Sequence, residues 1–139
     1  MSISEQEIFK EKYYSEAIEY MDNAKECLKK AKQEDNYYRK PKYVKRACKT
    51  AYNGSLVALD CFLILNGVDK PKRKERKSIE YYQNNIAKVD TKMQLYFDNT
   101  YKILYLSGYY DGLLVASVIK AGFDLAYKII EKIKPMPES

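Results

Sequence analysis

The feature that most constrains the fold is a helical spacing of apolar residues near the N-terminus. Small and apolar side chains recur there every three or four positions, at Tyr14, Ala17, Met21, Ala24, Leu28 and Ala31. This spacing places them on one face of an α-helix and suits packing in a bundle. The pair Ser4 and Glu7 has the spacing of a capping box, so the helix should begin near Ser4. It should end between residues 33 and 36.

A second helix is predicted to begin at Pro41, because the first turn of a helix needs no N–H from that position. Asn66 and Gly67 should end it as a C-cap pair. Its first half has a polar outer face. Its second half is apolar on all sides, with the outer residues Leu56, Val57, Leu63 and Ile64. A helix that is apolar all round is buried all round, so we expect this half at the centre of the bundle or in a subunit interface.

Three further helices should follow a basic connector at residues 70–77. The first carries Ile79, Tyr82 and Ile86 on its inner face, and Asp90 caps the next. The segment 107–112 is predicted to be a break or a tight turn, and the last helix should run from about residue 112 to 134. No strand-like alternation is present. The sequence therefore predicts one all-α domain over residues 1–139. It should be an up-and-down antiparallel bundle of four or five helices, with a frayed tail at about 135–139.

The absence of histidine limits the chemistry of the chain. It excludes Ser-His-Asp triads, Cys-His pairs, a histidine general base and histidine-ligated metals. Cys27, Cys48 and Cys61 form no CxxC pair, so we expect reduced core thiols and no structural zinc. Nucleotide-binding glycine motifs are also missing. We therefore expect no metal and no cofactor, and we favour a role without enzymatic activity.

The chain is expected to be cytoplasmic and not to interact with a membrane. Its longest apolar stretch, residues 56–65, is interrupted by Asp60. A membrane-spanning helix needs roughly 20 apolar residues. The N-terminus is polar and acidic and lacks the apolar core of a signal peptide.

Two basic stretches are candidate nucleic-acid-binding segments in a chain of net charge +6. One contains Arg39, Lys42, Lys45 and Arg46, interleaved with tyrosines, and the connector contains Lys72, Arg73, Lys74 and Arg76. Lysine and arginine neutralise phosphates, and tyrosine rings stack on unpaired bases. We favour the simpler interpretation that these residues are solvated faces of a lysine-rich protein, and the two stretches lie at opposite ends of the second helix.

A group of tyrosines and carboxylates is the candidate pocket or interface. Its members are Tyr52, Asp60, Tyr101, Tyr105, Tyr109, Tyr110 and Asp111. Tyrosines four residues apart line one groove if the helix persists, and their hydroxyls could bind a polar ligand or the end of a partner helix. The alternative is ordinary packing, with tyrosine bodies buried and hydroxyls at the rim. Asp60, among apolar neighbours, is either an acid of shifted pKa or a structural partner of a cation or a tyrosine hydroxyl, and we favour the structural role.

Three stretches together resemble a bacterial family of small helical bundles, chiefly from gut organisms of the Bacteroides type. They are Tyr20-x-x-Asn23-Ala24-x-Glu26-x-Leu28, Lys42-Tyr43-Val44-x-x-Ala47-x-x-x-Ala51-Tyr52-x-Gly54-x-Leu56-x-Ala58-Leu59-Asp60 and Leu104-x-Leu106-Ser107-Gly108-Tyr109-Tyr110-Asp111-Gly112. The resemblance covers nearly the whole chain. It implies the fold and carries no activity with it.

The helix layout is also similar to that of the HEPN superfamily. Members of that superfamily often dimerise, and many are ribonucleases with an Arg-x4-6-His motif or partners of nucleotidyltransferases. Here no histidine follows Arg39, Arg46, Arg73 or Arg76. The resemblance therefore implies a divergent, non-catalytic member.

Our first functional hypothesis is a non-enzymatic helical interaction module that forms a homodimer through apolar surface of the second or the fifth helix. The alternative is a HEPN-like protein associated with nucleic acid, a nucleotide or a nucleotidyltransferase-type partner, acting through the basic connector. An enzyme that uses Asp60, Asp111 and the tyrosines is the third hypothesis.

Overall fold

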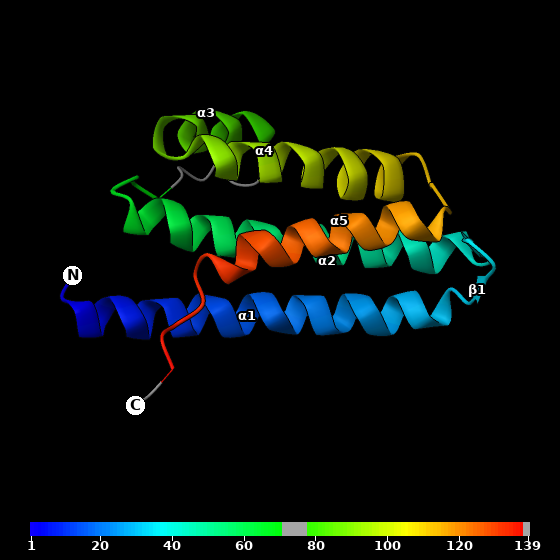
Figure 1. The fold of residues 1–139 in the computed structure, drawn as a ribbon, viewed down its shortest axis with the longest axis horizontal. Helices are drawn as coiled ribbons and strands as arrows, with labels where there is room; N and C mark the ends of the chain where they lie inside the picture. The colour runs from blue at the N-terminus through cyan, green and yellow to red at the C-terminus, as the bar shows by residue number, and fades with distance from the viewer. Residues whose placement is uncertain (71–77, 138–139) are drawn as a thin grey trace.

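The computed structural model describes residues 1–70 and 78–137 of the chain. These residues form five α-helices, one π-helix and one sheet of two short strands. In chain order the elements are α1 (Ile3–Lys30), β1 (Gln33–Glu34), β2 (Tyr37–Tyr38), α2 (Pro41–Leu65), α3 (Ile79–Val89), α4 (Thr91–Thr100), η2 (Tyr101–Tyr110) and α5 (Ala116–Glu131) (Figure 1). The prediction of a mostly helical chain is confirmed.

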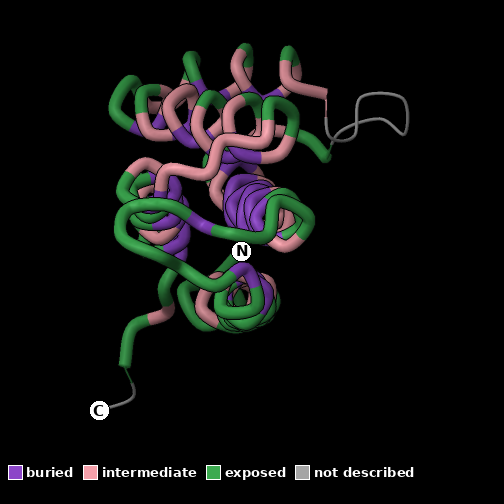
Figure 2. Tube along the Cα trace, turned by 90° about the vertical axis from the view of Figure 1, so that its right-hand side faces the viewer, coloured by how far each residue is buried: buried purple, intermediate pink, exposed green. Residues whose placement is uncertain are grey.

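The helices stack in three layers. Helix α1 lies on one side, α2 and α5 form the middle layer, and α3 lies with α4 and η2 on the other side (Figure 1, Figure 2). The long helices reverse direction along the chain: α1 and the α4–η2 unit run one way, and α2 and α5 run the other way. The middle layer therefore contacts both outer layers, and it contains many of the buried residues.

Helix α1 begins two residues earlier than the sequence predicted. The capping box is formed by Ser2 and Glu5, which have the same spacing as Ser4 and Glu7. The Ser2 hydroxyl accepts from the Glu5 N–H at 3.2 Å, and the Glu5 carboxylate accepts from the Ser2 N–H at 3.4 Å. Glu7 is instead engaged by the C-terminal segment. The expectation of a cap at Ser4 is therefore wrong.

The end of α1 also differs from the prediction. The helix ends at Lys30, and a hairpin whose two strands have two residues each joins it to α2. Lys32 and Asp35 adopt left-handed backbone conformations, with φ of 55° and 54°, which turn the chain away from the helix. Such short strands show no alternation in sequence, so the absence of strand signals did not reveal them.

Helix α2 has the predicted bounds and lies at the centre of the bundle. It begins at Pro41, and Gly67 follows its C-cap with φ of 84°. It packs against α1, α3, α5 and η2. Gly54 permits the closest approach to α1, because a Cβ atom there would lie 3.0 Å from Tyr20 Cβ. The central position accounts for much of the apolar surface of its second half, where Leu56 and Leu63 are buried and Val57 and Ile64 are half-buried.

Helix α5 also turns its apolar face into the chain. The outward side carries polar or small residues, including Ser117, Lys120, Ala121, Asp124 and Lys128. The apolar surface that we expected α2 or α5 to offer to a second copy is therefore largely covered within one chain. This helix begins at Ala116, four residues later than predicted, because Val115 is extended and forms a bridge with Tyr37.

Helical winding continues through the segment 107–110, where the sequence predicted a break. The turn comes later, at Asp111 and at Gly112 with φ of 73°. The π-type winding of η2 is marked by bonds from N–H groups to carbonyls five residues back, such as Asp111 N–H to Leu106 O at 2.9 Å. Gly108 allows η2 to pack closely on α2, because a Cβ atom at this position would lie only 2.9 Å from Cys48 Cβ. The π-helical segment η2 is therefore also the part of this helix that packs closely on α2.

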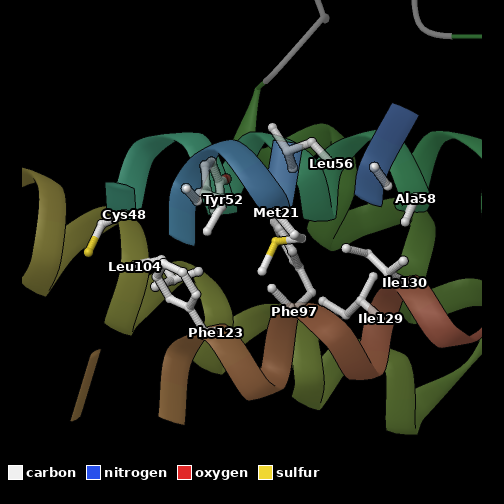
Figure 3. Close-up of a cluster of buried hydrophobic side chains, with 14 of the residues drawn as sticks. Met21, Cys48, Tyr52, Leu56, Ala58, Phe97, Leu104, Phe123, Ile129 and Ile130 are labelled. Atoms are coloured by element: carbon white, nitrogen blue, oxygen red, sulfur yellow. The ribbon is translucent and has the colours of Figure 1, made fainter. Parts of the chain in front are cut away.

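The core connects all three layers. Figure 3 shows Met21 of α1, Leu56 and Ala58 of α2, Phe97 of α4, and Ile129 and Ile130 of α5 directed toward a shared interior. Met21, Phe97 and Ile129 are fully buried. This core fixes the positions of α2 and of the α4–η2 unit, which carry the candidate site.

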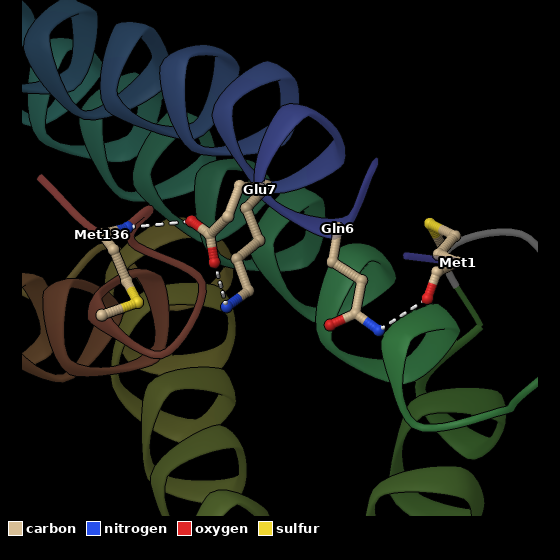
Figure 4. A network of polar contacts seen from close by, with 5 residues as sticks. Met1, Gln6, Glu7 and Met136 are labelled. Atoms are coloured by element: carbon tan, nitrogen blue, oxygen red, sulfur yellow. Dashed lines mark hydrogen bonds and ion pairs between the residues drawn. The ribbon is translucent and has the colours of Figure 1, made fainter. Parts of the chain in front are cut away.

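The C-terminal segment crosses back over the start of α1. The Met136 N–H donates to a Glu7 carboxylate oxygen at 2.9 Å, and Lys10 lies 3.4 Å from the other oxygen (Figure 4). Gln6 donates to the Met1 carbonyl nearby. The Met136 N–H and then Lys10 lower the pKa of Glu7 below its ordinary value.

We expect the contact between Glu7 and Met136 to be lost in acid. A carboxyl group with a lowered pKa stabilises the folded contact above the pKa of the free side chain, and this contribution disappears as the pH falls through the lowered value. The Met136 amide resonance in NMR spectra should therefore shift with a midpoint below about 4.3. Glu7→Gln should abolish the shift, whereas Glu11→Gln should preserve it. A Met136 resonance that does not respond to acid would contradict the contact.

None of the helices among the described residues is long and apolar enough to cross a membrane.

Candidate functional site

Four of the predicted tyrosines meet on one side of the bundle. Tyr101, Tyr105 and Tyr109 follow one another along η2, with successive ring centroids 5.4 Å and 5.6 Å apart. Tyr52 of α2 lies beside them, with its ring centroid 6.1 Å from Tyr101 and 5.2 Å from Tyr105. We call these four side chains the tyrosine cluster. The close approach of η2 to α2 at Gly108 places the two elements within reach of each other.

A lysine from α2 lies over the tyrosine cluster. The Lys49 Nζ atom is 5.2 Å from the ring centroid of Tyr105 and 4.6 Å from that of Tyr109. An ammonium group at this distance is attracted by the electron-rich ring faces. Lys49 is half-buried. The site therefore combines a positive charge with stacked aromatic rings.

An open groove of about 240 Å³ runs along the tyrosine cluster. It is lined by Lys49, Tyr52, Asn53, Leu56, Ile79, Tyr101 and Tyr105. Helix α2 supplies one wall, η2 supplies the opposite wall, and the start of α3 supplies Ile79 at one end. The lining includes a cation, an amide, phenol groups and apolar side chains, so the groove can contact both a planar apolar surface and polar edges.

Tyr52 is the most buried of the polar residues that line the groove, with 5% of its surface exposed. Among the described residues, its hydroxyl is not a fully buried atom that lacks a hydrogen-bond partner. Burial, followed by the neighbouring Tyr101 and Tyr105, raises the pKa of Tyr52. The phenol therefore stays neutral at physiological pH and can both donate and accept a hydrogen bond.

The basic stretch at the start of the second helix extended to Lys49, but Lys49, Asn53, Leu56 and Ile79 were not assigned to the candidate pocket from the sequence. Three of them were within reach of a periodicity argument: Lys49, Asn53 and Leu56 are spaced by four and three residues and so share the side of α2 that carries Tyr52. Ile79 carried no such signal, because its place in the groove depends on how α3 folds back onto α2.

Asp60 lies outside the groove and pairs with a tyrosine. The Tyr82 hydroxyl donates to Asp60 Oδ1 at 2.8 Å, and Tyr82 is buried. Burial and then Asp60 raise the pKa of Tyr82. The Tyr82 ring is 5.7 Å from that of Phe97, which in turn is 6.4 Å from that of Tyr52. Asp60 thus anchors α3 at the far end of an aromatic chain that leads to the groove.

Tyr110 and Asp111 do not join the tyrosine cluster. Tyr110 is 72% exposed at the end of η2, and Asp111 is exposed in the turn that follows. Neither lines the groove. The candidate pocket predicted from the sequence is therefore only partly brought together.

The basic residues near the start of α2 are solvent-accessible, and some have protein contacts. Arg39 pairs with Glu34 at 2.5 Å. Lys42 and Arg46 lie 5.3 Å and 5.9 Å from the ring centroid of Tyr43. Lys45 packs against Gly112, one helical turn before Lys49. The other predicted basic residues, Lys72, Arg73, Lys74 and Arg76, lie outside the described residues.

The cysteines are core residues. Cys27, Cys48 and Cys61 are buried free thiols. Burial raises the pKa of both Cys48 and Cys61 to about 12, which keeps these thiols protonated and poorly nucleophilic. Within the described ranges, no group of three or more cysteine and carboxylate side chains is arranged to hold a metal ion.

Comparisons with known proteins extend the fold but add no activity. The family described as "Domain of unknown function (DUF5618)" matches residues 12–135. A solved structure, a "protein of unknown function from Dyadobacter fermentans", is 38% identical with a TM-score of 0.79. The match covers 89% of this chain and 95% of that chain. No curated protein matches the sequence. The same bundle is therefore formed over nearly the whole length of a related chain.

Proposed function

The chain belongs to the DUF5618 family, and from the geometry of this member we propose that it is a non-enzymatic module that binds single-stranded nucleic acid in its tyrosine-lined groove. The observation that carries the proposal is a groove that brings together the nearly buried phenol of Tyr52, further tyrosine rings and the Lys49 ammonium.

The shape of the groove supports an aromatic ligand. A dry cavity of about 150 Å³ holds one benzene ring, and the groove of about 240 Å³ has room for one larger planar heterocycle. Leu56 and Ile79 supply apolar contacts, and the rings of Tyr101 and Tyr105 supply π faces. Stacking on tyrosine tolerates any base, so these walls suit a nucleobase without selecting one.

The polar groups of the groove support a nucleotide rather than a plain aromatic compound. The Tyr52 hydroxyl and the Asn53 amide each donate and accept hydrogen bonds, as the edges of bases require. Lys49 can neutralise a phosphate, and Lys42 and Lys45 continue its side of α2 toward the start of the helix. Phosphates that follow the bound nucleotide would meet these cations.

Binding is favoured over catalysis by the composition of the lining. The described lining residues include no carboxylate, thiol or imidazole group. Lys49 is the one ionised side chain among them, and Tyr52 stays a neutral phenol. A HEPN-like identity of the bundle is part of the proposal. It is supported by the helix layout alone.

The proposal predicts that Tyr105→Ala weakens binding of a fluorescein-labelled ten-nucleotide RNA or DNA, measured by anisotropy. We expect a loss of about 5- to 150-fold, the equivalent of one stacked base at about 1–3 kcal/mol.

Lys49→Gln should reduce the slope of log affinity against log salt by about 0.7. Tyr52→Phe should keep most of the affinity, because only the hydroxyl is removed and the ring remains.

Tyr110→Ala is the matched control, since Tyr110 is an exposed tyrosine of the same helix outside the groove. It should leave the affinity within about twofold, consistent with the small effects of surface substitutions. Competition by adenosine or uridine monophosphate separates a free nucleotide from a strand as the ligand. Absence of any anisotropy change at low salt, or equal losses for Tyr105→Ala and Tyr110→Ala, would overturn the proposal. Replacing Lys72, Arg73, Lys74 and Arg76 together by alanine tests the predicted connector independently.

Homodimerisation is a second candidate property. Leu95 is 60% exposed on α4, and Leu106 and Tyr110 are exposed further along the same continuous α4–η2 unit. These side chains, rather than the buried faces of α2 and α5, would be the surface for a second copy. Light scattering on Leu95→Lys and the unchanged protein tests this, and a monomeric unchanged protein at high concentration would reject it.

A further inference from the structure

A second cleft, of about 360 Å³, lies at the end of the bundle where α1, the hairpin and α5 meet (the β1 end in Figure 1). It is lined by Lys25, Leu28, Lys29, Gln33, Tyr38 and Lys120. None of these residues lines the tyrosine groove. From this lining we propose a separate binding site for a small organic anion, namely a carboxylate carried on an apolar body.

Two of the lysines are held in place by protein contacts. Lys120 Nζ donates to Gln33 Oε1 at 2.9 Å, and the Gln33 amide donates in turn to the Asp35 carbonyl at 2.8 Å. Lys25 Nζ lies 4.8 Å from the ring centroid of Tyr127, and a hydrogen bond with Tyr127 raises the pKa of Lys25. Two ammonium groups from different helices therefore flank the cleft; both side chains are exposed, and each has one contact with a neighbouring residue.

The neighbouring carboxylates do not cancel this charge. Lys29 pairs with Glu26 at 3.1 Å, but both side chains are largely exposed, and this pair is expected to be weak. Asp22 raises the pKa of Lys25 less than Tyr127 does. The cleft therefore keeps a net positive rim made by Lys25 and Lys120.

Tyr38 is a nearly buried phenol among the residues that line the cleft. Tyr38 is 4% exposed, and its backbone N–H is fixed by a bond of 2.9 Å to the Leu114 carbonyl. Burial raises the pKa of Tyr38, so the phenol keeps its proton. No partner for this hydroxyl is present among residues 1–70 and 78–137. A carboxylate oxygen would satisfy it, and a neutral donor next to two cations suits an anionic group.

The walls of the cleft determine the rest of the ligand. Leu28 and the methylene stems of the lysines make most of the lining apolar. The volume is more than twice the roughly 150 Å³ that holds one benzene ring. A single-ring or two-ring body with one carboxylate matches this combination, whereas inorganic phosphate would leave the apolar walls uncovered.

The test is titration of the full chain with 2-naphthoate, followed by isothermal calorimetry and by NMR shifts of the Gln33 and Tyr38 amides. We expect saturable binding, with weaker or no binding of neutral 2-naphthylmethanol and of inorganic phosphate. Lys120→Gln and Tyr38→Phe should each weaken naphthoate binding about tenfold, as expected for the loss of one hydrogen bond to a charged group. Lys30→Gln is the matched lysine control and should have no effect.

Equal binding of the neutral alcohol, no effect of Tyr38→Phe, or shifts confined to the tyrosine groove would each overturn the proposal. Tyr38→Phe removes one oxygen and preserves the ring, so the folded chain remains available for measurement. Because the two sites share no lining residue, loss of RNA binding leaves the naphthoate result unaffected, and the reverse also holds.

Discussion

Replacing Phe97 with alanine is expected to lower the free energy of unfolding by about 3–5 kcal/mol. Phe97 of α4 is fully buried. Its ring lies 5.7 Å from that of Tyr82, 6.4 Å from that of Tyr52 and 6.5 Å from that of Tyr101, measured between centroids. Removing it would leave a cavity between three elements, and the neighbouring rings are too rigid to fill that cavity fully.

Urea denaturation followed by circular dichroism measures this effect. Leu95→Ala is the control, because Leu95 is on the same helix and 60% exposed, and it should change stability by less than about 0.5 kcal/mol. A Phe97→Ala cost below about 1 kcal/mol would mean that the aromatic chain from Tyr82 to Tyr52 is not packed in solution. In that case Phe97 would not be the packing contact that holds Tyr52 and Tyr101 beside the groove.

The parts of the fold that sequence predicted well depend on local signals. Pro41, Gly67 and the Asp90 cap act within one turn of the chain, and the structure places each at a helix boundary. The inner faces of the helices follow from periodicity. Ser2 and Ser4 show the limit of such signals, because both begin an S-x-x-E pattern and only the distant contact of Glu7 with Met136 separates them.

The candidate site was predicted only in part, because it depends on contacts between distant elements. The sequence showed tyrosines spaced by four along one helix, and this spacing places them on one face of that helix. That Tyr52 faces them, and that Lys49 lies over Tyr105, depends on how η2 packs on α2. The cleft around Tyr38 was missed for the same reason: it needs the ends of α1 and α5 and a hairpin too short to recognise.

Gly108→Ala is expected to lower the free energy of unfolding by about 1–3 kcal/mol, the usual cost of overpacking. A Cβ at this position would lie 2.9 Å from Cys48 Cβ and 3.2 Å from the Ile103 carbonyl oxygen. Intrinsic helix propensity favours the opposite sign, since alanine in a helix interior is better than glycine by about 1 kcal/mol. The sign of the measured change therefore decides whether η2 is pressed against α2.

Cys48→Ala, made alone and together with Gly108→Ala, locates the cause. The Cys48 Sγ atom is the nearest neighbour of a Cβ added at Gly108. Removing the sulfur should therefore relieve part of the crowding, and the double variant should be more stable than the sum of the two single effects by about 0.5–3 kcal/mol. The relief is incomplete because the Cys48 Cβ atom remains. A stabilising Gly108→Ala, or strict additivity with Cys48→Ala, would mean that the two elements stand further apart. The Tyr52 ring would then no longer contact the Tyr105 ring, and the groove would lose the contact between its two walls.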